Sequence, residues 1–380
     1  MKSYGRASVH EIVGDLIVYR NLEPVDRRLP ALAEIRGEAG LAEGVIPRKS
    51  EAAYARVIVH LLRAARALDA PEASLRRLVS VGDTRLNDGT AFANICRAGG
   101  WPGLAFIAAE KDEPAEIEIV EQDGGTLFLA NRWAALDDFE SYCRDRGFAL
   151  DEATAVVVDL DKTTLGARGR NDHVIDGARV EAVRRTVGQL LGDDWDPAAF
   201  QRAYDLLNQP EFHPFTTDNQ DYLAYICLIL GSGLDDLAPV VARIRSGALA
   251  GFGQFLAEVD GRAGQLPADL REIHAGIYAR VRAGDPTPFK AFRYNEYRVT
   301  VERMGCLADG APLAEMLANE IVMTQEVRQA ALRWRAGGAL LFALSDKPDE
   351  ASVPSEELAV RGYQPIHRTE THAVGDREGR

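Results

Sequence analysis

The stretch AVVVDLDKTTL, residues 155–165, decides the fold. Its apolar start, with three valines in succession, predicts a buried strand of a parallel sheet. The strand ends in two aspartates two positions apart, Asp159 and Asp161, followed by a pair of threonines. Because ligands of open α/β sheets bind at the carboxyl ends of strands, this pair is placed to bind a cation and attack phosphorus. Asp after an apolar run is also a common strand-to-turn residue, so the rest of the chain must decide between the two interpretations.

Length and composition narrow the class of protein. The chain has 380 residues, 46% hydrophobic and 27% charged, which suits one large globular domain or two ordinary ones. A net charge of −14 argues against a general binder of nucleic acid or anionic membranes, but not against an anionic small molecule in a local cationic pocket. We find no signal peptide or bilayer-spanning run, and the four cysteines form no CxxC pair. We therefore expect a cytoplasmic protein with reduced, mostly buried thiols and without a membrane partner.

Other polar groups follow or precede predicted elements in the same way. The apolar strand Leu78–Val81 leads into a loop with Asp83 and Asp88, and the apolar strand Ala339–Leu344 leads into Ser345. Lys49 precedes a helix predicted over Ala52–Leu68. Phosphoryl transfer through an aspartate needs a carboxylate nucleophile, an acid, a divalent cation held by oxygens, and fixed donors for the phosphoryl oxygens. These clusters supply each group.

The distribution of predicted elements indicates an α/β protein with an insertion. From Asp176 to about Ala336 the pattern predicts almost only helices, with one weak strand signal over Tyr297–Val301. We divide the chain into a first core part at 1–170, a helical domain at 171–324 and a second core part at 325–380. In the core we also expect a short strand at Asp15–Tyr19, a helix at Pro30–Leu41 and a strand at Ile366–Ala373.

These residues resemble the motifs of the haloacid dehalogenase (HAD) superfamily of phosphohydrolases. Residues 159–165, DLDKTTL, look like its first motif, DxDxT, and Ser345 looks like its second. Lys49 looks like the third motif, and Gly82-Asp83-x4-Asp88 looks like the fourth. The motifs stand in the order third, fourth, first, second, which implies a circularly permuted chain. The resemblance covers roughly 45–165 and 325–375 and implies a Rossmann-like parallel sheet with an all-helical cap domain inserted between the first and second motifs.

The resemblance also implies roles for the motif residues. Asp159 would be the nucleophile that forms an aspartyl-phosphate, and Asp161 would be the general acid and base. Ser345, Lys49 and Thr163 would lie on the phosphate-binding side, with Thr163 also orienting Asp161. Mg²⁺ would be held by Asp159, Asp83, Asp88 and the backbone carbonyl of Asp161. Lys347 competes with Lys49 for the phosphate-binding role.

The predicted helical domain adds candidates for substrate contact. His213, Lys290 and Arg293 could contact the leaving group, or could be solvent-exposed or packed between helices. For His367 and His372 a metal role is the less favoured alternative.

The leading hypothesis is a Mg²⁺-dependent phosphatase acting on a small phosphorylated metabolite, with a homo-oligomer possible. Alternatives are a phosphotransferase or mutase of the same chemistry and a non-catalytic binding protein with the HAD fold. A further alternative is a phosphonate hydrolase in which Lys290 forms a Schiff base.

Overall fold

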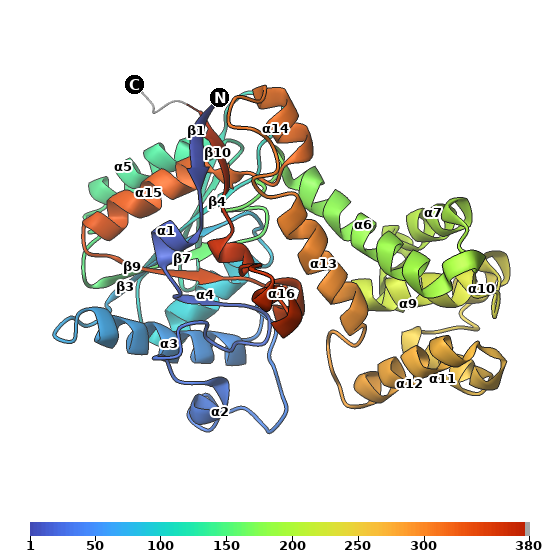
Figure 1. Ribbon diagram of the computed structural model, residues 1–380. Coiled ribbons are helices and arrows are strands. Elements are labelled where there is room, and N and C mark those ends of the chain that lie inside the picture. Colours follow the sequence, from blue (N-terminus) through green and yellow to red (C-terminus); the bar gives the residue numbers. More distant parts are fainter. Residues whose placement is uncertain (377–380) are drawn as a thin grey trace. The chain divides into compact units, whose positions relative to one another are not determined.

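The computed structural model describes residues 1–376 and divides the chain into two compact units (Figure 1). The core unit comprises residues 1–177, 300–353 and those from 358 onward, and the helical unit comprises 178–299 with 354–357. The helical unit is thus narrower than the predicted segment 171–324. None of the helices within residues 1–376 combines the length and the apolar character that a membrane crossing requires.

A seven-stranded sheet forms the centre of the core unit. Its order is β2-β9-β7-β3-β4-β6-β5, and all neighbouring strands are parallel except the β5–β6 hairpin. The strands are β2 (Ile17–Val18), β3 (Arg77–Gly82), β4 (Gly103–Ala108), β5 (Ile117–Gln122), β6 (Gly125–Ala130), β7 (Thr154–Asp159) and β9 (Leu340–Leu344). The expected α/β class with a mostly parallel sheet is therefore confirmed, as is the short strand within 15–19.

Helices cover both faces of this sheet (Figure 1). Helices α3 (Ala52–Asp69) and α4 (Asp88–Gly99) pack on one face, and α1 (His10–Val13), α5 (Leu136–Asp145) and α15 (Gln325–Ala336) pack on the other. Ile58 and Leu62 of α3 share one apolar cluster with Val157 and Phe342 of the sheet. Burial on both faces explains why the central strands are continuous apolar runs.

A small second sheet, β1-β10-β8, brings both ends of the described chain together. Strand β1 (Lys2–Ala7) pairs antiparallel with β10 (Thr371–Gly375), and β8 (Met323–Thr324) lies parallel to β10. The strand predicted over Ile366–Ala373 is wrong in its first half, where residues 366–368 form a 3₁₀ turn. Pro365 opens that turn, and its carbonyl accepts the N–H of Arg368 at 2.9 Å.

Two other predictions need correction or qualification. The helix expected over Pro30–Leu41 shrinks to α2 (Leu32–Ile35), because Gly37 ends it and Gly40 turns the chain at a φ of 66°. Cys96, Cys143 and Cys227 are buried as expected, whereas Cys306 is exposed. The remaining helices are α14 (Leu313–Asn319) in the core unit and α16 (Glu356–Val360), whose first two residues are assigned to the helical unit.

The chain between 178 and 299 is helical throughout its regular elements, as predicted. Helices α6 (Asp172–Leu191) and α13 (Lys290–Glu302) extend from one unit into the other along the chain, and the weak strand signal over Tyr297–Val301 is wrong because it lies within α13. The others are α7 (Pro197–Leu207), α8 (His213–Thr216), α9 (Gln220–Gly231), α10 (Leu237–Arg245), α11 (Phe252–Asp260) and α12 (Ala268–Arg282). Helix α9 is buried from Leu223 to Ile229, which makes it the centre of this unit's core.

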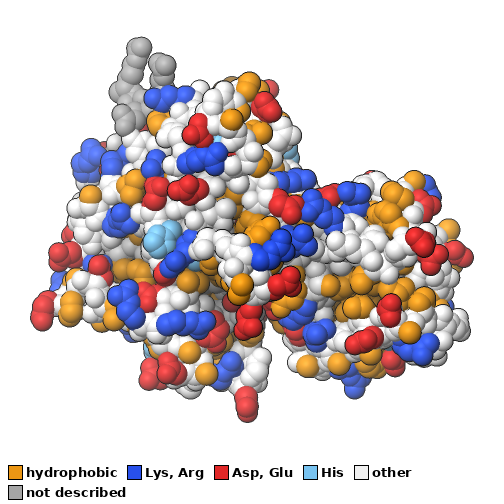
Figure 2. Space-filling view, in the orientation of Figure 1, with side chains coloured by type: hydrophobic (Ala, Val, Ile, Leu, Met, Phe, Trp, Pro, Cys, Tyr) orange, Lys and Arg blue, Asp and Glu red, His pale blue; other side chains and the backbone are white. Residues whose placement is uncertain are grey.

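Charges of both signs are interspersed over the face of the molecule seen in Figure 2. The excess of acidic residues is therefore not gathered into one large acidic patch on that face.

Candidate functional site

Three neighbouring parallel strands deliver polar side chains to one edge of the main sheet. Asp159 is the last residue of β7, Asp83 directly follows β3, and Ser345 directly follows β9. Strand β7 lies between β9 and β3, and all three run parallel, so their carboxyl ends meet. Lys49 lies just ahead of α3, and Asp88 is the first residue of α4.

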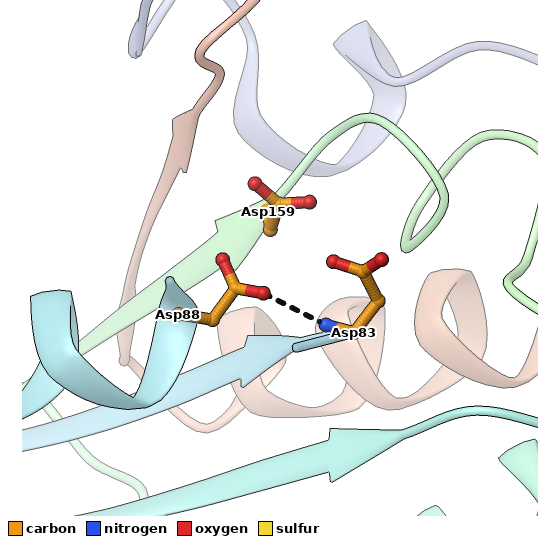
Figure 3. Close-up of side chains that lie close together, drawn as sticks. All are labelled: Asp83, Asp88 and Asp159. Carbon is orange, nitrogen blue, oxygen red and sulfur yellow. Dashed lines mark hydrogen bonds between the residues drawn. The ribbon is translucent and has the colours of Figure 1, made fainter. Parts of the chain in front are cut away.

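Three of these side chains form a compact acidic cluster, shown in Figure 3. One carboxylate oxygen from each of Asp83, Asp88 and Asp159 lies within 4.8 Å of the others. All three residues are nearly buried. Carboxylate oxygens are ligands that hard divalent cations such as Mg²⁺, Mn²⁺ and Ca²⁺ prefer, so the donor set fits a metal ion without fixing its identity.

Lys49 joins two members of this cluster. Its Nζ lies 2.6 Å from Oδ1 of Asp88 and 2.6 Å from Oδ1 of Asp159. Burial disfavours the ammonium, but the two carboxylates outweigh burial and hold the pKa of Lys49 well above its usual value. Lys49 is therefore charged at neutral pH.

Asp88 is held by the turn that precedes it. Its Oδ2 accepts the N–H of Asp83 at 3.1 Å, the N–H of Thr84 at 2.8 Å and the hydroxyl of Thr84 at 3.0 Å. Burial opposes ionisation, yet Lys49 and these donors lower the pKa of Asp88 to about 2. Gly82 is required here, because a Cβ at this position would lie 2.5 Å from the Cβ of Asp88.

The other two carboxylates resist ionisation. Burial and the neighbouring Asp88 raise the pKa of Asp83 to about 7, although Arg168 acts in the opposite direction. Burial, Asp88 and Asp83 also raise the pKa of Asp159 well above its usual value despite Lys49. Full ionisation of the three carboxylates would exceed the single positive charge of Lys49, and a bound divalent cation would favour that ionisation.

Asp161 and Ser345 lie beside a second lysine. Nζ of Lys347 is 3.8 Å from Oδ2 of Asp161, and the N–H of Lys347 donates to the Ser345 hydroxyl at 3.0 Å. Asp161 is partly exposed, whereas Lys347 is buried. Lys49 therefore contacts Asp159, while Lys347 faces Asp161, and both lysines line the same edge of the sheet.

Of the two threonines after Asp161, only Thr164 uses its hydroxyl in a hydrogen bond within residues 1–376. The hydroxyl of Thr164 donates to the carbonyl of Asp159 at 2.7 Å. Thr163 is fully buried, and its hydroxyl has no hydrogen-bond partner within residues 1–376, including Asp161. The carbonyl of Thr163 accepts the hydroxyl of Thr324 at 2.5 Å.

Two arginines near the site were not found from the sequence. The backbone N–H of Arg20 donates to the carbonyl of Lys347 at 3.1 Å, and its Nη1 donates to the carbonyl of Pro47 at 2.9 Å. Arg20 therefore ties the Ser345–Lys347 loop to the loop that carries Lys49. Arg168, in the loop after β7, donates from Nε to Oδ2 of Asp83. Its place in the glycine-containing run GARGR, just after the DxDxT pattern, was the available signal.

The three candidates in the helical unit already contact neighbouring residues of that unit. Arg293 is buried and bonds Asp221 at 2.8 Å and Glu296 at 2.6 Å. Lys290 lies 3.0 Å from Asp285, and His213 lies 3.7 Å from Asp218. For Arg293, this geometry favours the packing alternative over contact with a substrate.

The two C-terminal histidines have partners at both ring nitrogens. His367 contacts the Tyr19 hydroxyl at 2.9 Å and Asp15 at 3.1 Å. His372 contacts Glu320 at 2.8 Å and Asp309 at 3.2 Å. These contacts account for both rings without a metal ion.

Comparison of the chain with protein-family models, with curated proteins and with solved structures finds no match. The function must therefore be inferred from the residues and geometry of this site.

Proposed function

We propose that this protein is a HAD-like phosphohydrolase, a Mg²⁺-dependent phosphatase that hydrolyses a small phosphomonoester through an aspartyl-phosphate at Asp159. One observation carries the proposal: Lys49 bridges Asp88 and Asp159 at 2.6 Å at the end of β7. These groups come from positions far apart in the chain and correspond to three different motifs of the superfamily.

The order of the motifs is compatible with a circular permutation. A permutation joins the original ends of a fold and opens a continuous connection elsewhere, so the new ends of a permuted chain are also expected to lie close together. The pairing of β1 with β10, with Lys2 opposite Gly375, supports this requirement. In this proposal the helical unit is the cap inserted between the first and second motifs.

The proposed reaction has two steps at Asp159. First, its carboxylate attacks phosphorus while the bond to the leaving oxygen breaks, and Asp161 donates a proton to that oxygen. Asp161 then takes a proton from water, which attacks phosphorus and releases inorganic phosphate and the free carboxylate.

The remaining groups would bind the phosphoryl oxygens or the divalent cation. Ser345, Lys49 and Lys347 would donate to the phosphoryl oxygens. Asp159, Asp83, Asp88 and the carbonyl of Asp161 would hold a divalent cation, which supplies charge neutralisation between the carboxylate nucleophile and the phosphoryl group.

Phosphate release from a panel of phosphorylated sugars, nucleotides and small acids tests this proposal, with Mg²⁺ or with EDTA. We expect Mg²⁺-dependent release that Asp159→Asn abolishes and that Asp161→Asn lowers by about 10²–10⁴-fold. Asp176→Asn is the matched control, because Asp176 is half-exposed and pairs with Lys162. Release that survives Asp159→Asn, or a wild-type protein that releases no phosphate from any substrate, would contradict the proposal.

A further inference from the structure

The side chain of Arg168 donates a hydrogen bond to Oδ2 of Asp83. Among the described residues, the hydrogen bond between them joins Nε of Arg168 to Oδ2 of Asp83 alone. The arginine side chain is 34% exposed and that of Asp83 is 7% exposed, so the contact lies where the acidic cluster meets solvent.

The backbone of Arg168 is fixed on two sides. Its N–H donates to the carbonyl of Lys162 at 2.7 Å, within the loop that follows Asp159. Its carbonyl accepts the N–H of Glu110 at 2.9 Å and the indole N–H of Trp133 at 3.2 Å. The next residue, Gly169, has a φ of 77°, and a Cβ there would lie 1.9 Å from the carbonyl oxygen of Glu110. These hydrogen bonds fix the backbone of Arg168, and its side chain extends from this fixed position to Asp83.

The donors around the cluster bond to different carboxylate oxygens. The turn before α4 holds Oδ2 of Asp88, Lys49 holds one oxygen each of Asp88 and Asp159, and Arg168 holds Oδ2 of Asp83. Figure 3 shows one oxygen of the Asp83 carboxylate on the side of Asp88 and Asp159. The contact uses a single donor, so it is not the bidentate fork that arginine frequently forms with a carboxylate.

We propose that Arg168 positions Asp83 as a metal ligand by fixing Oδ2 so that Oδ1 faces the cation, an inference that rests on the metal requirement of the proposed function. Partners that orient metal ligands in this way typically change metal affinity by about 10–100-fold when they are removed. Arg168 then links the loop after the nucleophile to the Asp83 loop, so the two loops present their ligands together.

Calorimetric titration of the full chain with Mg²⁺ tests the inference without reference to turnover. We compare wild type, Arg168→Met, Arg168→Lys and the control Arg146→Met, since Arg146 is half-exposed and pairs with Glu121 at 3.5 Å. We expect Kd to rise about 10–100-fold in Arg168→Met and to recover in part in Arg168→Lys, which keeps a charged donor. The control should bind as wild type does, and unfolding curves in EDTA should show that each variant is folded.

The outcomes separate this inference from the proposed function. Unchanged or tighter Mg²⁺ binding by Arg168→Met, with a wild type that binds, would overturn the positioning role and leave the metal site standing. A wild-type chain that binds no Mg²⁺ would overturn both. Equal weakening in Arg168→Met and Arg146→Met would also refute the inference, because it would indicate a general charge effect.

Discussion

Replacement of Lys49 by Met should destabilise the metal-free core unit severely. Nζ of Lys49 lies 2.6 Å from Asp88 and 2.6 Å from Asp159, and the three side chains are only 7%, 4% and 11% exposed. Methionine has a similar length, so the substitution removes the charge with little change in packing volume. Two carboxylates then lose their buried counter-ion, and removing one partner of a buried ion pair costs about 3–5 kcal/mol in the free energy of unfolding.

The assay must report on the core unit alone. Three of the four tryptophans, Trp101, Trp133 and Trp334, lie in the core unit, and Trp195 lies in the helical unit. In a Trp195→Phe background, tryptophan fluorescence during urea unfolding in EDTA therefore follows the core unit. Lys162→Met is the matched control: its ion pair with Asp176 at 2.8 Å involves a half-exposed carboxylate and should contribute less than about 1 kcal/mol.

The sign of the pH effect provides a second check on Lys49→Met. The folded-state pKa of Asp159 is already raised, and loss of Lys49 would raise it further. A carboxyl group with a raised pKa destabilises the fold when ionised, so the penalty should be largest at high pH and shrink as pH falls. A variant within about 1 kcal/mol of its parent at pH 8 in EDTA would refute the charge arrangement described above.

Three further substitutions test other contacts. Gly82→Ala should lower the free energy of unfolding by about 1–3 kcal/mol in urea titrations, because the new Cβ would overlap Asp88. Asp349→Asn should stabilise the protein by about 1 kcal/mol at pH 8, since burial raises the pKa of Asp349 to about 6; the gain should fade between pH 6 and pH 4, measured by thermal unfolding. Arg293→Met should lower the free energy of unfolding of the helical unit by about 3–5 kcal/mol, because the buried Asp221 loses its cationic partner, while Glu296 keeps its ion pair with Arg179. The measurement is the fluorescence difference between chains with and without Trp195.

Each of these has its own control or contrary result. Gly37→Ala should be tolerated, because a Cβ there meets nothing within 4 Å. A pH-independent effect of Asp349→Asn would show that its carboxyl group is not the cause. A stable Arg293→Met variant with altered phosphate release would return Arg293 to the candidate substrate contacts.

The sequence was sufficient to predict the central strands, where the local hydrophobic pattern and the burial of the strands agree. The strand before Asp159 and the strands before Asp83 and Ser345 are apolar runs because both faces of the central sheet are covered. The clustering of their polar ends follows from the parallel pairing of neighbouring strands, so the proximity of Asp83, Asp159 and Ser345 could be predicted from the sequence. Lys49 was placed by its motif resemblance, and its contact with Asp159 joins residues 110 positions apart.

Contacts between distant segments without a pattern could not be predicted. Arg20 and Arg168 sit in irregular loops, and neither hydrophobic periodicity nor spacing indicates which carbonyl or carboxylate an arginine reaches. Residues 366–368 form a 3₁₀ turn where a strand was predicted. An alternating hydrophobic pattern gives no indication of a turn that begins at Pro365. The buried hydroxyl of Thr163, which bonds no described residue, likewise shows that a motif match does not fix a side chain's partners.

The charges at the edge of the sheet explain how an acidic protein could accept an anion. Fully ionised, Asp83, Asp88, Asp159 and Asp161 contribute four negative charges, and Lys49, Lys347 and Arg168 contribute three positive ones. This net charge of −1 is the negative limit for the site without a metal ion, because the raised pKa values of Asp83 and Asp159 favour their neutral forms. With all four carboxylates ionised, a bound divalent cation would change the net charge of these groups from −1 to +1, although the chain has a formal charge of −14. In the proposed function, a bound divalent cation would favour ionisation of Asp159, which is the form that attacks phosphorus, and would leave the site cationic toward the phosphoryl group.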